Sequence, residues 1–239
     1  MEISTLVLFD IDGTLLRGGP AKEAFRIALL EVFGTAGRAA EWEFSGKTDP
    51  QIARELMLDA GVSSGRVDHG LEVLWQVYLR EMESRIAGDP PEVLPGVHEL
   101  LGALGEVEGA MLGLVTGNIA AGAAVKLRSA NLAERFPIGA FGSDHEERNH
   151  LPRVAIQRAE EQWGTTFAAS RVVVIGDTPR DVACGRHAGA RTVGVATGRF
   201  GIDDLAGAGA DRVYEDLSDV EELLGTILDR NGSIGSLEP

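Results

Sequence analysis

The sequence has little cysteine, few aromatic residues and no long hydrophobic run. A single cysteine, Cys184, can neither form an intrachain disulfide nor by itself build a cysteine zinc site, which is typical of a reducing compartment. No apolar run reaches the roughly 18 residues that a membrane span needs, and Glu2 stands where a signal peptide carries positive charge. We therefore expect a cytoplasmic protein that has no membrane partner.

Positive charge is also scarce. Lysine and arginine together number 22 against 37 acidic residues, which gives a formal net charge of −15. This balance argues against nonspecific binding to nucleic acid or anionic lipid, so no nucleic-acid partner is expected. An anionic small molecule can still bind where the site supplies local positive charge. Only three of the cations are lysines, namely Lys22, Lys47 and Lys126, so each lysine needs individual attention.

The composition that is present is typical of a soluble globular protein, with 44% hydrophobic and 25% charged residues. A length of 239 residues favours one large domain or a core with a small second domain. Short apolar runs alternate with stretches of helical periodicity, a pattern that predicts an α/β fold with a doubly wound, mostly parallel, Rossmann-like sheet. The expected strands are 6–9, 111–115, 138–141, 172–175, 192–195 and 212–214, and the expected helices 97–105, 119–130, 151–163, 180–189 and 218–229.

The alternation breaks between the first two strands. About 75 residues with three helical segments and no convincing strand lie there, far more than an ordinary crossover needs. Glycines and prolines bound the segment on both sides. We therefore expect an all-helical cap domain over residues 18–89, inserted into a core domain of residues 1–17 and 90–239. The tail, 231–239, is expected to fray.

The first strand leads directly into two carboxylates, Asp10 and Asp12, followed by Gly13. In open parallel sheets the carboxyl edge of the strands is where ligands bind. Gly13 would allow the backbone to turn sharply at this edge. Standing alone, the pair could also be turn or helix-capping aspartates.

A second pair of carboxylates, Asp177 and Asp181, follows the strand at 172–175. If this strand lies beside the first one, Asp10, Asp177 and Asp181 converge on one spot. Three like charges at close range repel one another unless a cation neutralises them, and a hard, oxygen-preferring ion such as Mg²⁺ suits them. A helix-capping role would explain Asp177 but not the whole set.

The strand at 111–115 is followed by Thr116, Gly117 and Asn118. This places a hydroxyl at the same sheet edge, with backbone N–H groups at a helix start that can bind an anion. Alone, such a tripeptide is more often a helix cap than a phosphate site. Its position between the two acidic motifs gives it weight.

Together these motifs resemble the haloacid dehalogenase superfamily, most closely its phosphoglycolate-phosphatase-like members with a helical cap. The resemblance extends from Leu6 to about Val195. It implies that Asp10 is a nucleophile that forms an aspartyl-phosphate and that Asp12 is the general acid and base. It also implies that Mg²⁺ is held by Asp10, the backbone carbonyl of Asp12, and Asp177, with Asp181 in support. By the same resemblance Thr116 is a catalytic residue, and Gly117 and Asn118 bind the substrate.

The third motif of the superfamily departs from its usual pattern, because no lysine precedes the helix at 151–163. Arg148 lies nearest the expected place, and Arg153 is the alternative. An arginine can supply the charge and a bidentate fork, so loss of catalysis does not follow. Either arginine could instead pair with neighbouring acids on a solvated loop.

In the expected cap, Lys47 lies on a loop that could close over the substrate and meet its second charge, such as a carboxylate. The alternative is a solvated loop lysine.

The leading hypothesis is Mg²⁺-dependent hydrolysis of a small phosphorylated metabolite by a monomer or homodimer. Four alternatives remain. A phosphomutase shares the aspartates, and a 2-haloacid dehalogenase typically lacks an acid at the position of Asp12. A phosphonatase would use a cap lysine such as Lys47 as a Schiff base, and a non-catalytic binding protein would not need the intact acidic set.

Overall fold

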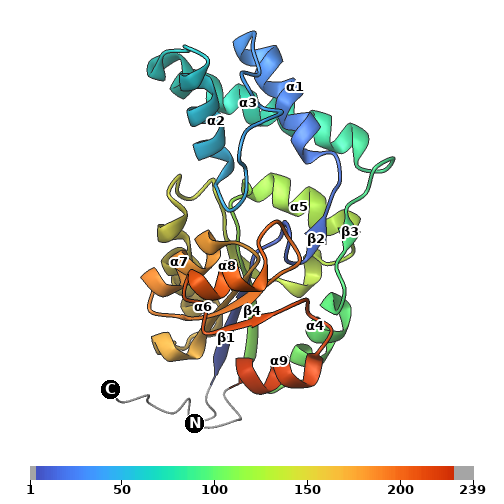
Figure 1. Cartoon of the computed structure of the whole chain (residues 1–239), viewed down its shortest axis with the longest axis vertical. Coiled ribbons are helices and arrows are strands. Elements are labelled where there is room, and N and C mark those ends of the chain that lie inside the picture. Colours follow the sequence, from blue (N-terminus) through green and yellow to red (C-terminus); the bar gives the residue numbers. More distant parts are fainter. Residues whose placement is uncertain (1–3, 229–239) are drawn as a thin grey trace.

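The computed structural model describes residues 4–228, and its centre is a sheet of six parallel strands (Figure 1). Across the sheet the order is β5-β4-β1-β6-β7-β8. The strands are β1 (Thr5–Phe9), β4 (Ala110–Val115), β5 (Ile138–Ala140), β6 (Val172–Gly176), β7 (Arg191–Val195) and β8 (Arg212–Tyr214). The predicted α/β fold with a parallel sheet is confirmed.

Strand β1 lies at the middle of the sheet, between β4 and β6. Phe9 is level with Leu114 on one side and with Ile175 on the other. Because all three strands run in the same direction, the residues that follow them leave the sheet at one edge. The first strand and the strand at 172–175 are therefore adjacent, as the predicted convergence of the aspartates requires.

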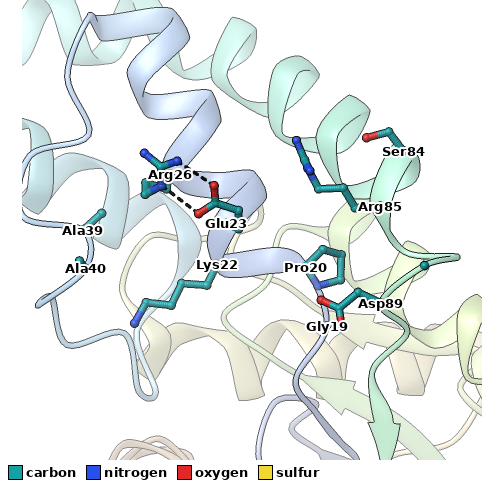
Figure 2. A pocket seen from close by; sticks show the side chains of 11 residues that line it. Gly19, Pro20, Lys22, Glu23, Arg26, Ala39, Ala40, Ser84, Arg85 and Asp89 are labelled. Carbon is teal, nitrogen blue, oxygen red and sulfur yellow. Dashed lines mark hydrogen bonds and ion pairs between the residues drawn. The ribbon is translucent and has the colours of Figure 1, made fainter.

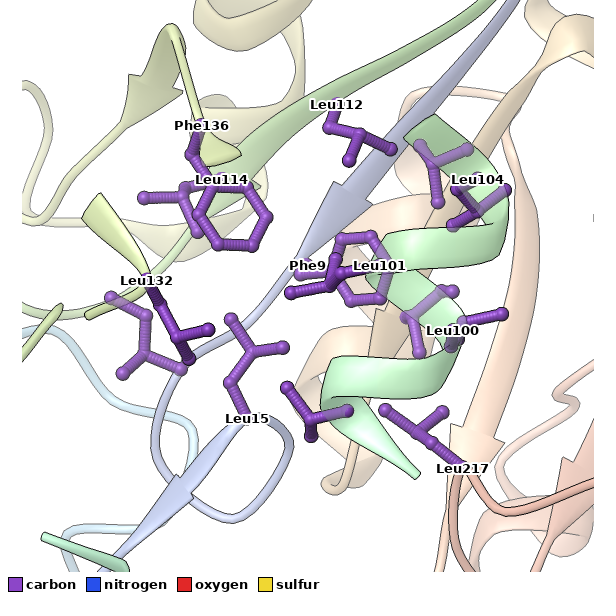
Figure 3. Packing of buried hydrophobic residues seen from close by; sticks show 14 of the residues in the cluster. Phe9, Leu15, Leu100, Leu101, Leu104, Leu112, Leu114, Leu132, Phe136 and Leu217 are labelled. Carbon is purple, nitrogen blue, oxygen red and sulfur yellow. The ribbon is translucent and has the colours of Figure 1, made fainter. Parts of the chain in front are cut away.

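Helices cover both faces of the sheet, and the alternation of side chains along β1 shows how. Val7 and Phe9 pack into a cluster with leucines of α4, drawn in Figure 3, while Leu6 and Leu8 pack with residues of α6 and α7 on the other face. Burying each such side chain contributes about 1.5–3 kcal/mol. The helices of the sheet layers are α4 (Val97–Gly105), α5 (Ala120–Ser129), α6 (Leu151–Trp163), α7 (Pro179–His187), α8 (Ile202–Gly207) and α9 (Val220–Ile227).

Three further helices, here called the inserted helices, lie beyond the carboxyl edge of the sheet (Figure 1). They are α1 (Ala21–Phe33), α2 (Asp49–Asp59) and α3 (Ser64–Arg85). Their apolar faces form a cluster of their own, which includes Phe25, Leu56 and Tyr78 and extends to Val125 of α5. The inserted helices therefore share part of their buried surface with the helix that follows the second motif.

Two details of the connections differ from expectation. The segments that lead to and from the inserted helices pair as a short antiparallel ladder of β2 (Leu16–Arg17) and β3 (Glu92–Val93), so the expectation of no strand between 9 and 111 was wrong. Helix α8 was not predicted. The expected fraying of 231–239 concerns residues outside the described part. Among residues 4–228, no helix has both the length and the apolar character needed to cross a membrane.

Candidate active site

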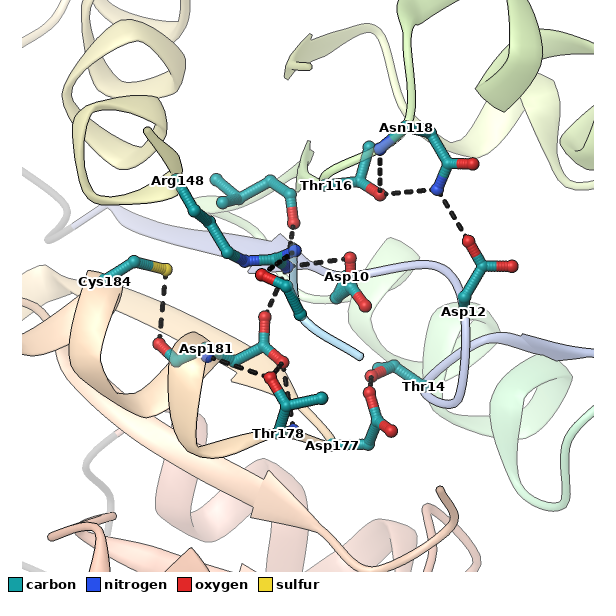
Figure 4. Close-up of polar contacts among 12 residues, drawn as sticks. Asp10, Asp12, Thr14, Thr116, Asn118, Arg148, Asp177, Thr178, Asp181 and Cys184 are labelled. Atoms are coloured by element: carbon teal, nitrogen blue, oxygen red, sulfur yellow. Dashed lines mark hydrogen bonds and ion pairs between the residues drawn. The ribbon is translucent and has the colours of Figure 1, made fainter. Parts of the chain in front are cut away.

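Three buried carboxylates meet at the carboxyl edge of the sheet, as Figure 4 shows. Asp10 follows β1, Asp177 follows β6, and Asp181 lies in the first turn of α7. Each exposes at most 4% of its surface. One carboxylate oxygen from each lies within 4.8 Å of the others, the only such group of potential metal ligands in the described residues. A divalent cation with oxygen ligands fits this donor set.

Local sequence fixes Asp181 in place. Its backbone N–H donates to the Thr178 hydroxyl oxygen at 3.2 Å, and its Oδ2 accepts from the Thr178 backbone N–H at 3.0 Å, a reciprocal capping box at the start of α7. Its Oδ1 accepts a hydrogen bond from Arg148. Both oxygens therefore have protein partners, which suits a supporting position beside a cation.

Gly13 allows the loop after β1 to approach Asp177. Its φ is +88°, and a Cβ added there would lie 2.2 Å from Oδ2 of Asp177. Any side chain would therefore displace the carboxylate as well as strain the backbone. The sharp turn expected at Gly13 is confirmed.

Arg148 reaches the carboxylates from the loop before α6. The guanidinium Nη2 lies 2.9 Å from Oδ1 of Asp10 and also pairs with Asp181, and only 6% of its side chain is exposed. Arg153 is exposed, and the structure gives it no ion pair or hydrogen bond within residues 4–228. Of the two alternatives, Arg148 therefore has the geometry of the missing lysine, and its catalytic role stays a prediction.

The second motif lies opposite. Asn118 donates from its side-chain amide to the Thr116 hydroxyl oxygen at 2.8 Å and to Oδ2 of Asp12 at 2.7 Å. A Cβ on Gly117 would lie 2.1 Å from the carbonyl oxygen of Lys47, so only glycine lets the loop between α1 and α2 approach this closely. The three motifs and Lys47 thus meet at one place.

Lys126 is a site residue that the sequence analysis did not assign. From α5 its ammonium donates to both oxygens of Asp12 at 2.7 Å. The scarcity of lysine was the available signal, because all three lysines of the chain line the same cleft. What the sequence could not show is which face of α5 turns towards Asp12.

The charges divide the site into two parts. Burial, reinforced by neighbouring carboxylates, raises the pKa of Asp177 from 3.8 to about 9. Burial also raises the pKa of Asp10 to about 6, although Arg148 opposes the shift. Partial burial works in the same direction on Asp12, but Lys126 and Asn118 outweigh it and lower its pKa. The group around Asp10 and Asp177 is therefore short of positive charge, and a cation would relieve it.

Asp10, Asp12 and Asp177 line the floor of a cleft of about 500 Å³ between the sheet edge and the inserted helices. The opposite wall carries Phe25, Phe44 and Tyr78. Lys47 also lines the cleft, where its ammonium pairs with Glu55 and lies 5.4 Å from the centre of the Trp42 ring. The expected cap lysine therefore reaches the cleft with an acidic partner already beside it.

Direct contacts hold the inserted helices against the sheet edge. The Thr48 hydroxyl donates to the backbone carbonyl of Glu146 at 2.6 Å, and Arg54 pairs with the Glu146 carboxylate at 2.9 Å. Asp49 accepts a hydrogen bond from the backbone N–H of Ile119 at 2.8 Å, at the N-terminus of α5. The cleft is therefore covered in this structure.

A larger hollow of about 750 Å³ lies near the start of α1 and the end of α3 (Figure 2). Its lining includes the ion-paired Glu23 and Arg26, and Arg85, which pairs with Glu81. None of the four aspartates at the sheet edge lines it. Size alone therefore does not make it a site of reaction.

Comparison with known proteins agrees with this geometry. The family model described as haloacid dehalogenase-like hydrolase matches residues 7–195. The chain belongs to this family. The phosphoglycolate phosphatases of Rhodospirillum rubrum and Escherichia coli K12 are each 27% identical to it, over 224 and 236 residues. The alignments cover 92% of this chain in both cases, and 90% and 92% of those proteins.

Among solved structures, a hydrolase from Pseudomonas syringae matches this family member with a TM-score of 0.67 and 24% identity, covering 96% of this chain and all of that one. A β-phosphoglucomutase candidate from Bacteroides vulgatus matches with a TM-score of 0.68 and 19% identity, covering 97% and 91% of the two chains. These two matches show that this chain and the two solved proteins share one fold.

Proposed function

We propose that this chain hydrolyses the phosphate ester of a small metabolite, such as phosphoglycolate, through an aspartyl-phosphate on Asp10. The observation that carries the proposal is the position of Asp10. It lies at the floor of a covered cleft, beside two further buried carboxylates and in contact with the charge of Arg148. Family membership and relatives named phosphoglycolate phosphatase support the same activity.

In the first step, an oxygen of Asp10 attacks phosphorus and the ester P–O bond breaks, while the protonated form of Asp12, which its lowered pKa makes a minor form, gives its proton to the leaving oxygen. In the second step, Asp12 takes a proton from water, the water oxygen attacks phosphorus and the bond to Asp10 breaks. Arg148 stabilises the transferring phosphoryl oxygens, and Thr116 and the N–H groups at Gly117 and Asn118 bind them.

Mg²⁺ would be held by Asp10, the backbone carbonyl of Asp12, and Asp177, with Asp181 in support. When bound, it neutralises the phosphoryl group and the carboxylates so that an anion can attack an anion. The close grouping of three buried carboxylates supports this assignment, because burial and mutual repulsion raise the pKa values of Asp10 and Asp177 and a bound cation would relieve both effects.

Residues 18–89 act in this proposal as a cap domain over the core of residues 1–17 and 90–239. Lys47 lines the cleft from the cap side and is the candidate for binding a second charge on the substrate. Movement of the cap would admit the substrate and then exclude water.

The test is a screen of phosphorylated metabolites that includes 2-phosphoglycolate, with Mg²⁺ and with EDTA. We expect phosphate release that requires Mg²⁺ and a phosphorylated Asp10 in acid-quenched protein by mass spectrometry. Full turnover in EDTA would contradict the proposal and favour a dehalogenase. Transfer of the phosphoryl group to a second position of a sugar phosphate, without release of phosphate, would indicate a phosphomutase.

A further inference from the structure

Lys126 closes a ring of hydrogen bonds with Asp12 and Asn118. Its ammonium donates to Oδ1 and Oδ2 of Asp12 and to Oδ1 of Asn118, each at 2.7 Å. Asn118 completes the ring by donating to Oδ2 of Asp12 at 2.7 Å. The carboxylate of Asp12 is thus held from two directions by groups that are themselves bonded to each other.

The partners differ in exposure, and this shows which of them is fixed. The side chain of Lys126 is 6% exposed, whereas that of Asp12 is 49% exposed. A buried ammonium is strongly destabilising unless acceptors surround it, and here the number of acceptors equals its three N–H donors. Lys126 is therefore the fixed member, anchored on α5, and Asp12 is the member that faces the cleft.

The choice of lysine also fits the geometry. Every cation of the chain other than Lys22, Lys47 and Lys126 is an arginine, and all three lysines line this cleft. An arginine presents a planar fork suited to one carboxylate, whereas an ammonium is a compact charge that can reach three acceptors in different directions. The ring around Asp12 requires the second geometry.

We infer that Lys126 is a positioning residue that holds the Asp12 carboxylate, together with Asn118, in place for proton transfer. The inference rests on the proposed function, in which Asp12 gives a proton to the leaving oxygen and later takes one from water. Without Lys126 the half-exposed carboxylate keeps only the Asn118 amide, so it would sample positions away from the leaving oxygen. Misplacement of a proton-transfer group by about 1 Å is enough to slow the step about 10²-fold.

The experiment separates the step that needs Asp12 least from the step that needs it most. With p-nitrophenyl phosphate the leaving group departs without a proton, so the pre-steady-state burst of nitrophenolate reports attack by Asp10. Steady-state turnover reports the attack of water, which needs Asp12 as a base. We expect Lys126→Met to keep the burst rate within about twofold to threefold, to lower steady-state turnover about 10-fold or more, and to accumulate aspartyl-phosphate.

Two further variants complete the design. Lys126→Arg keeps the charge but not the three-point geometry, so its turnover should lie between those of Lys126→Met and wild type. Arg128→Met is the matched control, because it removes an exposed cation from the same helix. It should leave both rates unchanged. If Lys126→Met does not fold, Lys126→Arg still carries the test through the ratio of burst rate to turnover.

The outcomes distinguish two failures. A wild-type enzyme that releases phosphate from p-nitrophenyl phosphate without phosphorylated Asp10 would refute the aspartyl-phosphate route, and the role of Lys126 with it. A wild-type burst together with equal slowing of both steps in the Lys126 variants would refute the positioning role alone. Unchanged rates in Lys126→Met would refute it as well.

Discussion

The two sides of the cleft floor differ in the positive charge that they supply to their carboxylates. On the buried side, Asp10 and Asp181 share the charge of Arg148, and Asp177 has no ion pair within residues 4–228. On the open side, Asp12 pairs with Lys126 and also accepts a hydrogen bond from the Asn118 amide. The pKa values follow this division, since those of Asp10 and Asp177 are raised and that of Asp12 is lowered. The buried side is therefore short of positive charge, whereas on the open side Lys126 already balances the charge of Asp12.

The largest expected effect comes from the nucleophile on the buried side. Asp10→Asn should reduce turnover to background, because a neutral amide cannot form the acyl phosphate. Asp12→Asn should still form aspartyl-phosphate from a substrate with a good leaving group but hydrolyse it slowly. Rapid-quench mass spectrometry of both variants checks the difference. Equal, mild defects in the two would mean that the roles are wrongly assigned.

The next effect concerns the charge that the buried side already has. Arg148→Ala should lower kcat by about 10² or more, the scale for loss of one transition-state contact. Arg153→Ala is the matched control from the same segment and should be mild, because Arg153 is exposed. Steady-state kinetics with Mg²⁺ at saturation checks both. A larger loss in the Arg153 variant would reverse the assignment.

A metal and pH experiment tests whether the buried side is short of positive charge. In EDTA the folded protein holds a proton on Asp177 up to a pKa of about 9, whereas an unfolded chain releases it near 3.8. Stability should therefore be greatest at low pH within this window and fall as pH rises towards 9. Each kcal/mol corresponds to roughly 2–4 °C in melting temperature for a chain of this size.

Mg²⁺ should reverse this trend, because it binds the deprotonated carboxylates and its effect grows with pH. Differential scanning fluorimetry from pH 5 to pH 9, with EDTA and with Mg²⁺, measures both slopes. In Asp177→Asn the fall in EDTA should become shallower and the response to Mg²⁺ should shrink. A wild-type melting temperature that rises with pH in EDTA would show that the buried side is not short of positive charge.

The smallest effect is expected from Lys47, which lines the cleft on the side of the inserted helices. Lys47→Ala should raise KM for a carboxylate-bearing substrate only about threefold to tenfold, because Glu55 already neutralises much of the lysine charge. KM for p-nitrophenyl phosphate should hardly change, since that substrate offers no second charge. Equal increases for both substrates would assign Lys47 to the closed position of the loop rather than to the substrate.

The sequence predicted the buried side better than the open side, and the reason is physical. Asp10, Asp177 and Thr116 follow strands directly, so the rule for parallel sheets places them at one edge once the strands are recognised. Lys126 lies in a helix interior, where its contact with Asp12 depends on the rotation of α5 against the sheet. Likewise, no local pattern reveals that Leu16–Arg17 pairs with Glu92–Val93, because the two segments are far apart in the chain.

The N-terminus of α5, the helix that carries Lys126, is capped by a residue from another helix. Ile119 provides no side-chain acceptor for the N-terminus of α5, and Asp49, from the start of α2, accepts one of its N–H hydrogen bonds instead. If α2 moved away from the sheet edge, the backbone N–H of Ile119 would lose that acceptor. An arriving phosphoryl group offers a replacement acceptor at the same helix end. Exchange of one acceptor for the other would link the admission of substrate to the helix that holds Asp12.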